Sequence, residues 1–225
     1  MTHPTSRPGP DALAPTRSSL LSPALRRDLA DLNAEYLDLG LSPGLDGDPR
    51  FAWSDAVRQC LLAADGATLA QVAAVPFALF DLALPAGSAA ATPARVEDSR
   101  PSARSGALPG ALQGRCESFA HQAAFLARRL VEGEPLASRV VLGLSTDAQT
   151  WLAECRLVQL AELAGNPRLI RPRWRLHVRF WEMLVGAARR ASPAALQWAY
   201  CTGLCLIGID DEVPVPPSPR RRGRS

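Results

Sequence analysis

The chain contains one phrase twice, LAQVAAVPFALF at Leu69–Phe80 and LAELAGNPRLIR at Leu160–Arg171. The copies stand 91 residues apart and share Leu, Ala, Ala and Pro at matching places. Upstream at the same offset, Leu61 corresponds to Leu152. A fixed offset that persists over tens of residues is typical of an internal repeat. The sequence therefore predicts a duplicated unit.

Helix signals surround the first copy of the phrase. After Ser22-Pro23, apolar residues recur every three or four positions and predict an amphipathic helix; they are Leu25, Leu29, Leu32, Tyr36 and Leu39. Ser54 and Thr68 stand where an N-cap side chain is expected, each before a short apolar helix. Pro76 is expected to end the second of these helices.

The second copy is expected to repeat this arrangement. A long helix is predicted over residues 117–133, Ser145 is expected to cap the next, and Gly165-Asn166-Pro167 to end the one after that. Two further helices are predicted, at about residues 175–190 and from Ser192-Pro193 onward. Because no segment shows the alternation of a strand, an all-α fold is predicted.

The predicted architecture is two similar small helical units joined by a flexible linker, with a C-terminal helical extension. The linker is rich in Pro, Gly and Ser and has no hydrophobic period. The predicted segments are a disordered tail at 1–22, helical unit 1 at 23–84, the linker at 85–115, helical unit 2 at 116–174, the extension at 175–209 and a disordered Arg-rich tail at 210–225.

The composition indicates a soluble globular protein. Hydrophobic residues make up 47% of the 225, yet no apolar run approaches the ~20 residues of a membrane span. Without a recognisable signal peptide, the five Cys are expected to stay reduced in the cytoplasm. Every basic residue is Arg, which we attribute to genome composition, and the Arg residues cluster chiefly at the end, in Arg220, Arg221, Arg222 and Arg224.

The chain offers few residues for catalysis. Apart from His3 in the N-terminal tail, the histidines are His121 and His177, and neither lies in a nucleophile or metal motif. Cys201 and Cys205 share a helix face, but a structural zinc site needs four ligands, so buried thiols are expected there. We therefore expect no enzymatic activity, no cofactor and no bound metal.

The stretch RLIRPRWRLHVRFW, Arg168 to Trp181, interleaves five Arg with aromatic residues. Arg and aromatic side chains bind phosphates and bases, so a nucleic-acid surface is one interpretation. The other is a buried helix face, because Leu176, Phe180 and Leu184 lie at helical spacing.

Residues 147–155 and 157–165 have the length and short joint of a helix-turn-helix. The second of these helices would offer base edges chiefly Gln159 and Glu162, which are few polar groups for sequence readout. A protein-binding or structural helical hairpin is therefore favoured over DNA readout.

The run Phe125–Trp174 resembles the central part of the D subunit of the bacterial flagellar master transcriptional activator. Successive phrases of that family match Leu126-Ala127-Arg128-Arg129-Leu130, Leu142-Gly143-Leu144-Ser145, Leu152 and Leu157–Ala164. The opening of the family's first helix is matched in the first unit instead, by Asp31, Asn33, Tyr36 and Leu37.

The resemblance implies an all-helical, non-enzymatic protein of transcription control. In that family the D subunit is a dimer that binds a zinc-carrying C subunit and activates flagellar genes. A C-type subunit is therefore the expected protein partner, and DNA a further one. The two units are expected to pair within the chain as a pseudo-dimer through their first helices, with a homo-oligomer as the alternative.

Two sets of residues follow from these expectations. The expected partner or DNA surface consists of Arg128, Arg129, Arg168, Arg171 and Arg173. The expected packing or dimer-like interface consists of Tyr36, Leu126, Leu130, Leu152, Leu160 and Leu163.

Two other functions stay open, because the chain departs from the family in its length, linker, final helices and Arg tail. One is a helical adaptor or structural interaction protein with no role at DNA. The other is non-specific binding of nucleic acid or anionic membrane by the Arg tail alone.

Overall fold

The computed structural model describes residues 20–84 and 110–210, with side chains up to residue 207. This part of the chain is mostly helical, with one two-stranded sheet, so the all-α prediction is confirmed. The elements are α1 (Pro23–Leu41), the 3-10 helix η2 (Pro49–Phe51), α2 (Asp55–Leu62), α3 (Gly66–Ala73), β1 (Phe80–Leu82), α4 (Gly110–Gly133), α5 (Pro135–Leu142), α6 (Thr146–Glu154), α7 (Leu157–Ala164), β2 (Ile170–Pro172), α8 (Val178–Arg189) and α9 (Pro193–Asp210).

Three predicted serine caps are confirmed. The hydroxyl oxygens of Ser22, Ser54 and Ser145 accept hydrogen bonds from the backbone N–H three residues later. The cap assigned to Thr68 is wrong. Asp65 begins that helix, and its carboxylate accepts the Thr68 N–H at 2.7 Å. An aspartate three residues upstream satisfies the first turn and lets the helix start earlier.

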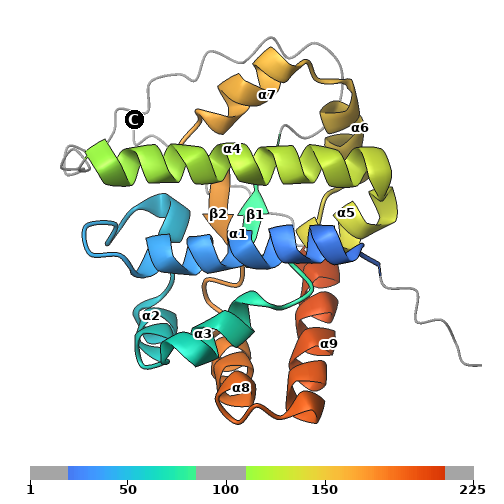
Figure 1. Cartoon of the computed structure of the whole chain (residues 1–225). Coiled ribbons are helices and arrows are strands. Elements are labelled where there is room, and N and C mark those ends of the chain that lie inside the picture. Colours follow the sequence, from blue (N-terminus) through green and yellow to red (C-terminus); the bar gives the residue numbers. More distant parts are fainter. Residues whose placement is uncertain (1–19, 85–109, 211–225) are drawn as a thin grey trace, which may run out of the picture.

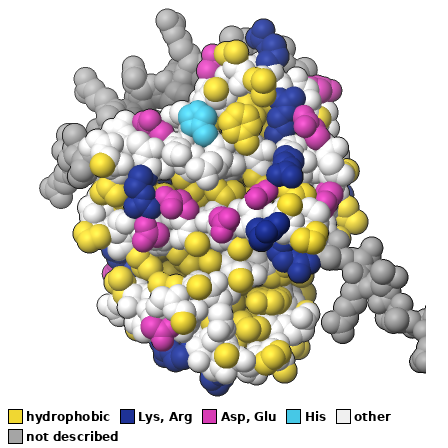
Figure 2. Space-filling view, viewed as in Figure 1, with side chains coloured by type: hydrophobic (Ala, Val, Ile, Leu, Met, Phe, Trp, Pro, Cys, Tyr) yellow, Lys and Arg dark blue, Asp and Glu magenta, His cyan; other side chains and the backbone are white. Residues whose placement is uncertain are grey.

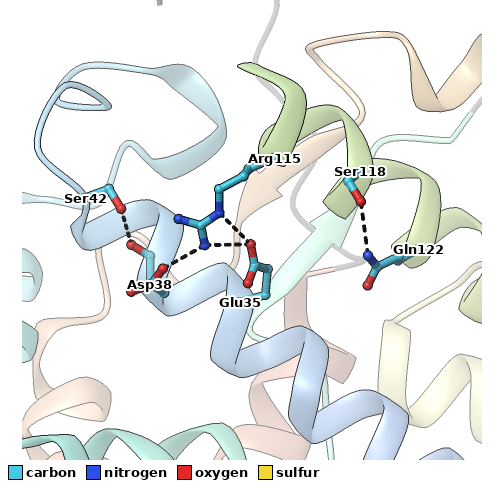
Figure 3. A network of polar contacts seen from close by, with 6 residues as sticks. All are labelled: Glu35, Asp38, Ser42, Arg115, Ser118 and Gln122. Atoms are coloured by element: carbon cyan, nitrogen blue, oxygen red, sulfur yellow. Dashed lines mark hydrogen bonds and ion pairs between the residues drawn. The ribbon is translucent and has the colours of Figure 1, made fainter. Parts of the chain in front are cut away.

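The first helices of the two units, α1 and α4, lie side by side in opposite directions (Figure 1). Ion pairs join them at both ends. Arg115 of α4 reaches Glu35 and Asp38 of α1, each at 2.7 Å, and Figure 3 shows its guanidinium between the two carboxylates. Near the other end of α1, Arg129 pairs with Asp28 at 2.9 Å. These contacts fix the antiparallel register of the two helices.

A short antiparallel sheet, which the sequence did not predict, joins the two units behind this helix pair. Phe80 pairs with Pro172 and Asp81 with Arg171. At the 91-residue offset, Phe80 corresponds to Arg171 and Asp81 to Pro172. Exchanging the corresponding residues therefore converts the Phe80–Pro172 pair into the Arg171–Asp81 pair. This is the register that a two-fold axis between the halves produces. Strands of three residues are too short to show alternation in a sequence.

The helices that follow also keep the offset. α3 and α7 differ by 91 residues at both ends, and α2 and α6 begin 91 residues apart. α1 packs on α2 and α3, as α4 packs on α6 and α7. The two halves thus share one order of packed elements, while their duplication from one ancestor stays a prediction.

One hydrophobic core serves both halves. Tyr36 of α1 is fully buried, and its ring lies 5.4 Å from Phe80 and 5.7 Å from Phe119 of α4, measured between centroids. Its hydroxyl donates a hydrogen bond to the Arg50 carbonyl oxygen at 3.1 Å. Of the predicted packing residues, Leu163 is half-buried and the others are buried, namely Tyr36, Leu126, Leu130, Leu152 and Leu160.

Asn33 of α1 is a buried polar residue that binds the turn after α3. Its side-chain amide donates to the carbonyl oxygens of Ala73 and Phe77 and accepts the Leu79 N–H, at 2.9–3.1 Å. A buried amide with these partners is satisfied, and it holds the turn after α3 against α1.

The C-terminal helices pack on the first half, and α9 also packs on α5 of the second half. α8 packs on α2 and α3, and α9 packs on α8. Phe180 and Leu184 are buried as expected, but Leu176 is 68% exposed and that prediction is wrong. The reason is that α8 begins only at Val178, so Leu176 lies in the preceding turn and not on the buried helix face.

The predicted linker is shorter than expected. α4 begins at Gly110, so residues 110–115 are helical. Residues 85–109, the N-terminal tail up to residue 19 and the Arg tail from residue 211 lie outside the described residues. Within the ranges that are described, no helix combines the length and apolar character that crossing a membrane would need.

Candidate functional site

Arg173, predicted as part of a partner surface, is buried, with 2% of its surface exposed. Its guanidinium forms an ion pair with Asp81 at 2.5 Å. It also donates to the carbonyl oxygens of Ala78, Val141 and Leu142, at 2.6–3.1 Å. The surface assignment is wrong for this residue, because its side chain is buried and binds Asp81 and three backbone carbonyl groups from both halves.

Arg128 and Arg129 lie on α4, and both are engaged within the chain. Arg128 pairs with Glu132 at 2.7 Å and donates to the Cys155 carbonyl oxygen at the end of α6, also at 2.7 Å. The hydrogen bond that Arg128 donates to the Glu132 carboxylate raises the pKa of Arg128. Arg129 is exposed and pairs with Asp28. Figure 2 shows basic and acidic side chains side by side over this face, so it has no surplus of positive charge.

Arg171 lies in β2 and Arg168 shortly before it, and both are exposed. They line an open surface hollow of about 800 Å³ together with Arg175, which is also exposed. We call this the basic hollow. The other polar residues that line the hollow are Asp81 and His177. The backbone of Arg175 is held in place by its carbonyl oxygen, which accepts the Ser54 N–H at 3.1 Å. Arg175 was not among the predicted surface residues, although it belongs to the Arg-rich stretch that contains Arg168, Arg171 and Arg173.

The aromatic residues of that stretch belong to the core and not to the hollow's surface. Trp174 and Trp181 are 3% and 0% exposed. The Trp174 ring packs edge-on against Phe77 and Phe180, with centroids 5.2 and 4.5 Å away. Trp174 has a positive φ of 51°, unusual for a residue other than glycine, at the turn that leads to α8. The sequence stretch therefore divides into exposed Arg side chains and buried rings.

The helical hairpin α6–α7 exposes apolar side chains. Leu157 and Val158 at the start of α7 are 63% and 64% exposed. Gln159 and Glu162 are exposed as well, and Ala161 lies between them. An exposed pair of large aliphatic side chains suits contact with a protein better than hydrogen bonding to base edges.

Cys201 and Cys205 are exposed, so their predicted burial is wrong. The cause lies between them. A Cβ atom on Gly203 would come within 2.5 Å of the Phe77 ring, so α9 approaches the core through this glycine. Residues two positions from Gly203 then point away from the core. Within the described residues, no group of three or more His, Cys, Asp or Glu could hold a metal ion.

The two histidines of the described ranges belong to no such group. His121 on α4 is partly exposed and its Nδ1 lies 2.8 Å from the Glu117 carbonyl oxygen, while His177 is exposed at the hollow. The acidic residues Asp211 and Glu212 lie outside the described residues.

The other thiols are shielded. Cys116 and Cys155 are buried, and burial raises the pKa of both, as it does for the half-buried Cys60. A raised pKa keeps a thiol protonated at neutral pH and slows its reactions.

The chain matches no protein-family model, no curated protein and no solved structure with which it was compared.

Proposed function

We propose that the chain is a non-enzymatic, transcription-regulator-like protein that acts through protein–protein contacts, similar to the D subunit of the flagellar activator. One observation carries the proposal: two helical halves pair within one chain through α1 and α4, as the resemblance to a dimeric regulator predicts. After α4, the phrases matched to that family fall at the end of α5, on α6 and on α7, in that order.

The surface best suited to a protein partner is the start of α7. In the first half, α8 packs on α2 and α3, the helices that correspond to α6 and α7 of the second half. On α7, by contrast, Leu157 and Val158 are largely exposed. Covering two such side chains contributes about 1.5–3 kcal/mol each when they become fully buried, which makes them suitable central contacts of an interface.

Affinity purification of the tagged protein from its native host, after nuclease treatment, tests this function. We expect capture of a C-type activator subunit or of RNA polymerase components. The variant Leu157→Gln/Val158→Gln should lose this capture. The matched control Leu62→Gln/Leu136→Gln alters two aliphatic residues that are 56% and 64% exposed on other helices, and it should keep the partner.

Capture of an assembly unrelated to transcription, lost in the same α7 variant, would replace this function by that of a helical adaptor. Equal capture by both double variants would show that α7 is not the docking surface.

A further inference from the structure

The geometry points to the basic hollow as a docking site for the phosphodiester backbone of duplex DNA. The inference deepens the proposed function, on which it rests for its role in transcription, and it names the ligand of one surface. It is built on Arg168, Arg171 and Arg175, which line the hollow and are exposed.

The first argument is uncompensated charge. Among the described residues, none of these three guanidinium groups pairs with a carboxylate, whereas Arg115, Arg128 and Arg129 on α4 all do. Asp81 is the acidic residue that lines the hollow, and its partner is the buried Arg173 at 2.5 Å. Arg173 thus neutralises the Asp81 carboxylate, and the positive charges of Arg168, Arg171 and Arg175 remain for an anion.

The second argument is position. At the 91-residue offset, Arg168, Arg171 and Arg175 stand where the first half has Phe77, Phe80 and Leu84. Phe77 and Phe80 are fully buried, and Leu84 is partly buried. The second half therefore carries three exposed charges at positions that the first half uses for packing. Exposed Arg at all three places, where the first half has two buried rings and a partly buried Leu, favours a charged ligand over a structural role.

The third argument selects the duplex over a single strand. Single-strand sites stack bases on exposed aromatic rings. Trp174 is the indole that lines the hollow, and its ring is packed against Phe77 and Phe180 and 97% hidden from solvent. Guanidinium groups match phosphate oxygens as paired donors. The hollow thus suits the backbone of a duplex and offers no ring for an unpaired base.

The expected contribution of the hollow to DNA binding can be stated as the dependence of DNA affinity on salt concentration. Each phosphate that a protein neutralises on B-DNA changes the slope of log affinity against log salt by roughly −0.9. Three contacts therefore give a slope of about −2.7 and weaken binding ~40-fold between 50 and 200 mM salt.

The test measures binding of a fluorescent DNA duplex of random sequence to the full chain by anisotropy over this salt range. The hollow variant is Arg168→Gln/Arg171→Gln/Arg175→Gln. The control is Arg27→Gln/Arg139→Gln/Arg190→Gln, which alters three exposed Arg outside the hollow. Both variants have 22 basic and 22 acidic residues, because each loses three of 25 Arg, so their net charge is equal at 0. Thermal melting verifies that both remain folded.

We expect the slope of the hollow variant to be smaller than that of the wild type by about 2.7, and the control to lose much less. Equal losses in the two variants would overturn the inference in favour of net charge alone. An unchanged slope in the hollow variant would overturn it in favour of another basic segment, such as Arg220–Arg224. Tighter binding of a single strand of the same length would contradict the choice of the duplex.

The two proposals can fail separately. Absence of salt-dependent DNA binding by the wild-type chain, with partner capture retained, would refute the docking site and leave the proposed function. DNA binding that the hollow variant loses, combined with no capture of a transcription partner, would refute the proposed function and leave the docking site.

Discussion

Arg173 and Asp81 form an ion pair of 2.5 Å beneath the basic hollow, between the residue that follows β2 and the middle of β1. The pair joins the two halves of the chain, because Arg173 also donates to Ala78 of the first half and to Val141 and Leu142 of the second. One buried guanidinium thus satisfies four acceptors at the junction.

Replacing Arg173 by Met should destabilise the fold by about 2 kcal/mol or more. The methionine retains much of the side-chain volume but leaves the carbonyl oxygens of Ala78 and Leu142 without this donor, at about 1–3 kcal/mol each. The Val141 carbonyl still accepts the Ala78 N–H. Loss of the ion pair with Asp81 adds little to the destabilisation, because the Asp81 side chain is 45% exposed and can be hydrated. Urea denaturation measures the change. The exposed Arg171→Met is the control and should shift stability by less than about 0.5 kcal/mol; equal effects of the two would refute the structural role of Arg173.

Tyr36 predicts a loss of stability at alkaline pH. Burial, and after it the charge of Asp81, raises the pKa of the Tyr36 hydroxyl well above its usual value near 10. The folded state then keeps the proton that the unfolded state releases above pH ~10, so this contribution to stability is present below that pH and is lost as pH rises.

The variant Tyr36→Phe separates this effect from other titrations. At neutral pH it should be less stable by about 1 kcal/mol, since the hydrogen bond to the Arg50 carbonyl is lost. Because Phe cannot ionise, the difference between the two proteins should shrink and then reverse above pH 10. Urea titrations at pH 8, 10 and 11 measure it, and a constant difference would contradict the burial of the hydroxyl.

Four of the five thiols should divide by exposure. Cys201 and Cys205 are exposed on α9, and we expect both to react rapidly with a thiol reagent at pH 8. Cys116 and Cys155 should react only on unfolding, because they are buried and their pKa is raised. The variant Cys201→Ser/Cys205→Ser should lose the fast phase. Rapid labelling of Cys116 in the folded protein would contradict the packing of α4.

The shared core predicts that the halves depend on each other. Expressed as two chains, residues 1–84 and 110–225, they should form a 1:1 complex through α1–α4, the β1–β2 sheet and the seat of α8 on α2 and α3. Each chain alone should lack a cooperative unfolding transition, because its core faces would be exposed to water. Circular dichroism and sedimentation measure both results. Independent folding of either chain would indicate two separate domains.

Local signals made much of the fold predictable. Serine caps and the three-to-four spacing of Leu25, Leu29 and Leu32 mark helices by contacts within a few residues, so the sequence suffices to place them. The exception among the caps, Thr68, arose because Asp65 offers a competing oxygen three residues earlier.

The site was less predictable, because it depends on contacts distant in the sequence. Arg171 and Arg173 are two positions apart in one Arg-rich stretch, yet the first is exposed and the second is buried. Nothing local distinguishes them. The difference comes from Asp81, 92 residues before Arg173, and from the carbonyl groups at the end of α5. The exposure of Cys201 likewise depends on Phe77, which packs against Gly203.

Chromatin immunoprecipitation of the tagged chain from its native host tests the proposed role in transcription most directly, with the wild type compared to Arg168→Gln/Arg171→Gln/Arg175→Gln and to Arg27→Gln/Arg139→Gln/Arg190→Gln. We predict enrichment of promoter DNA with the wild type and the second variant, and its loss with the first. Absence of promoter enrichment with the wild-type protein would contradict a function in transcription control.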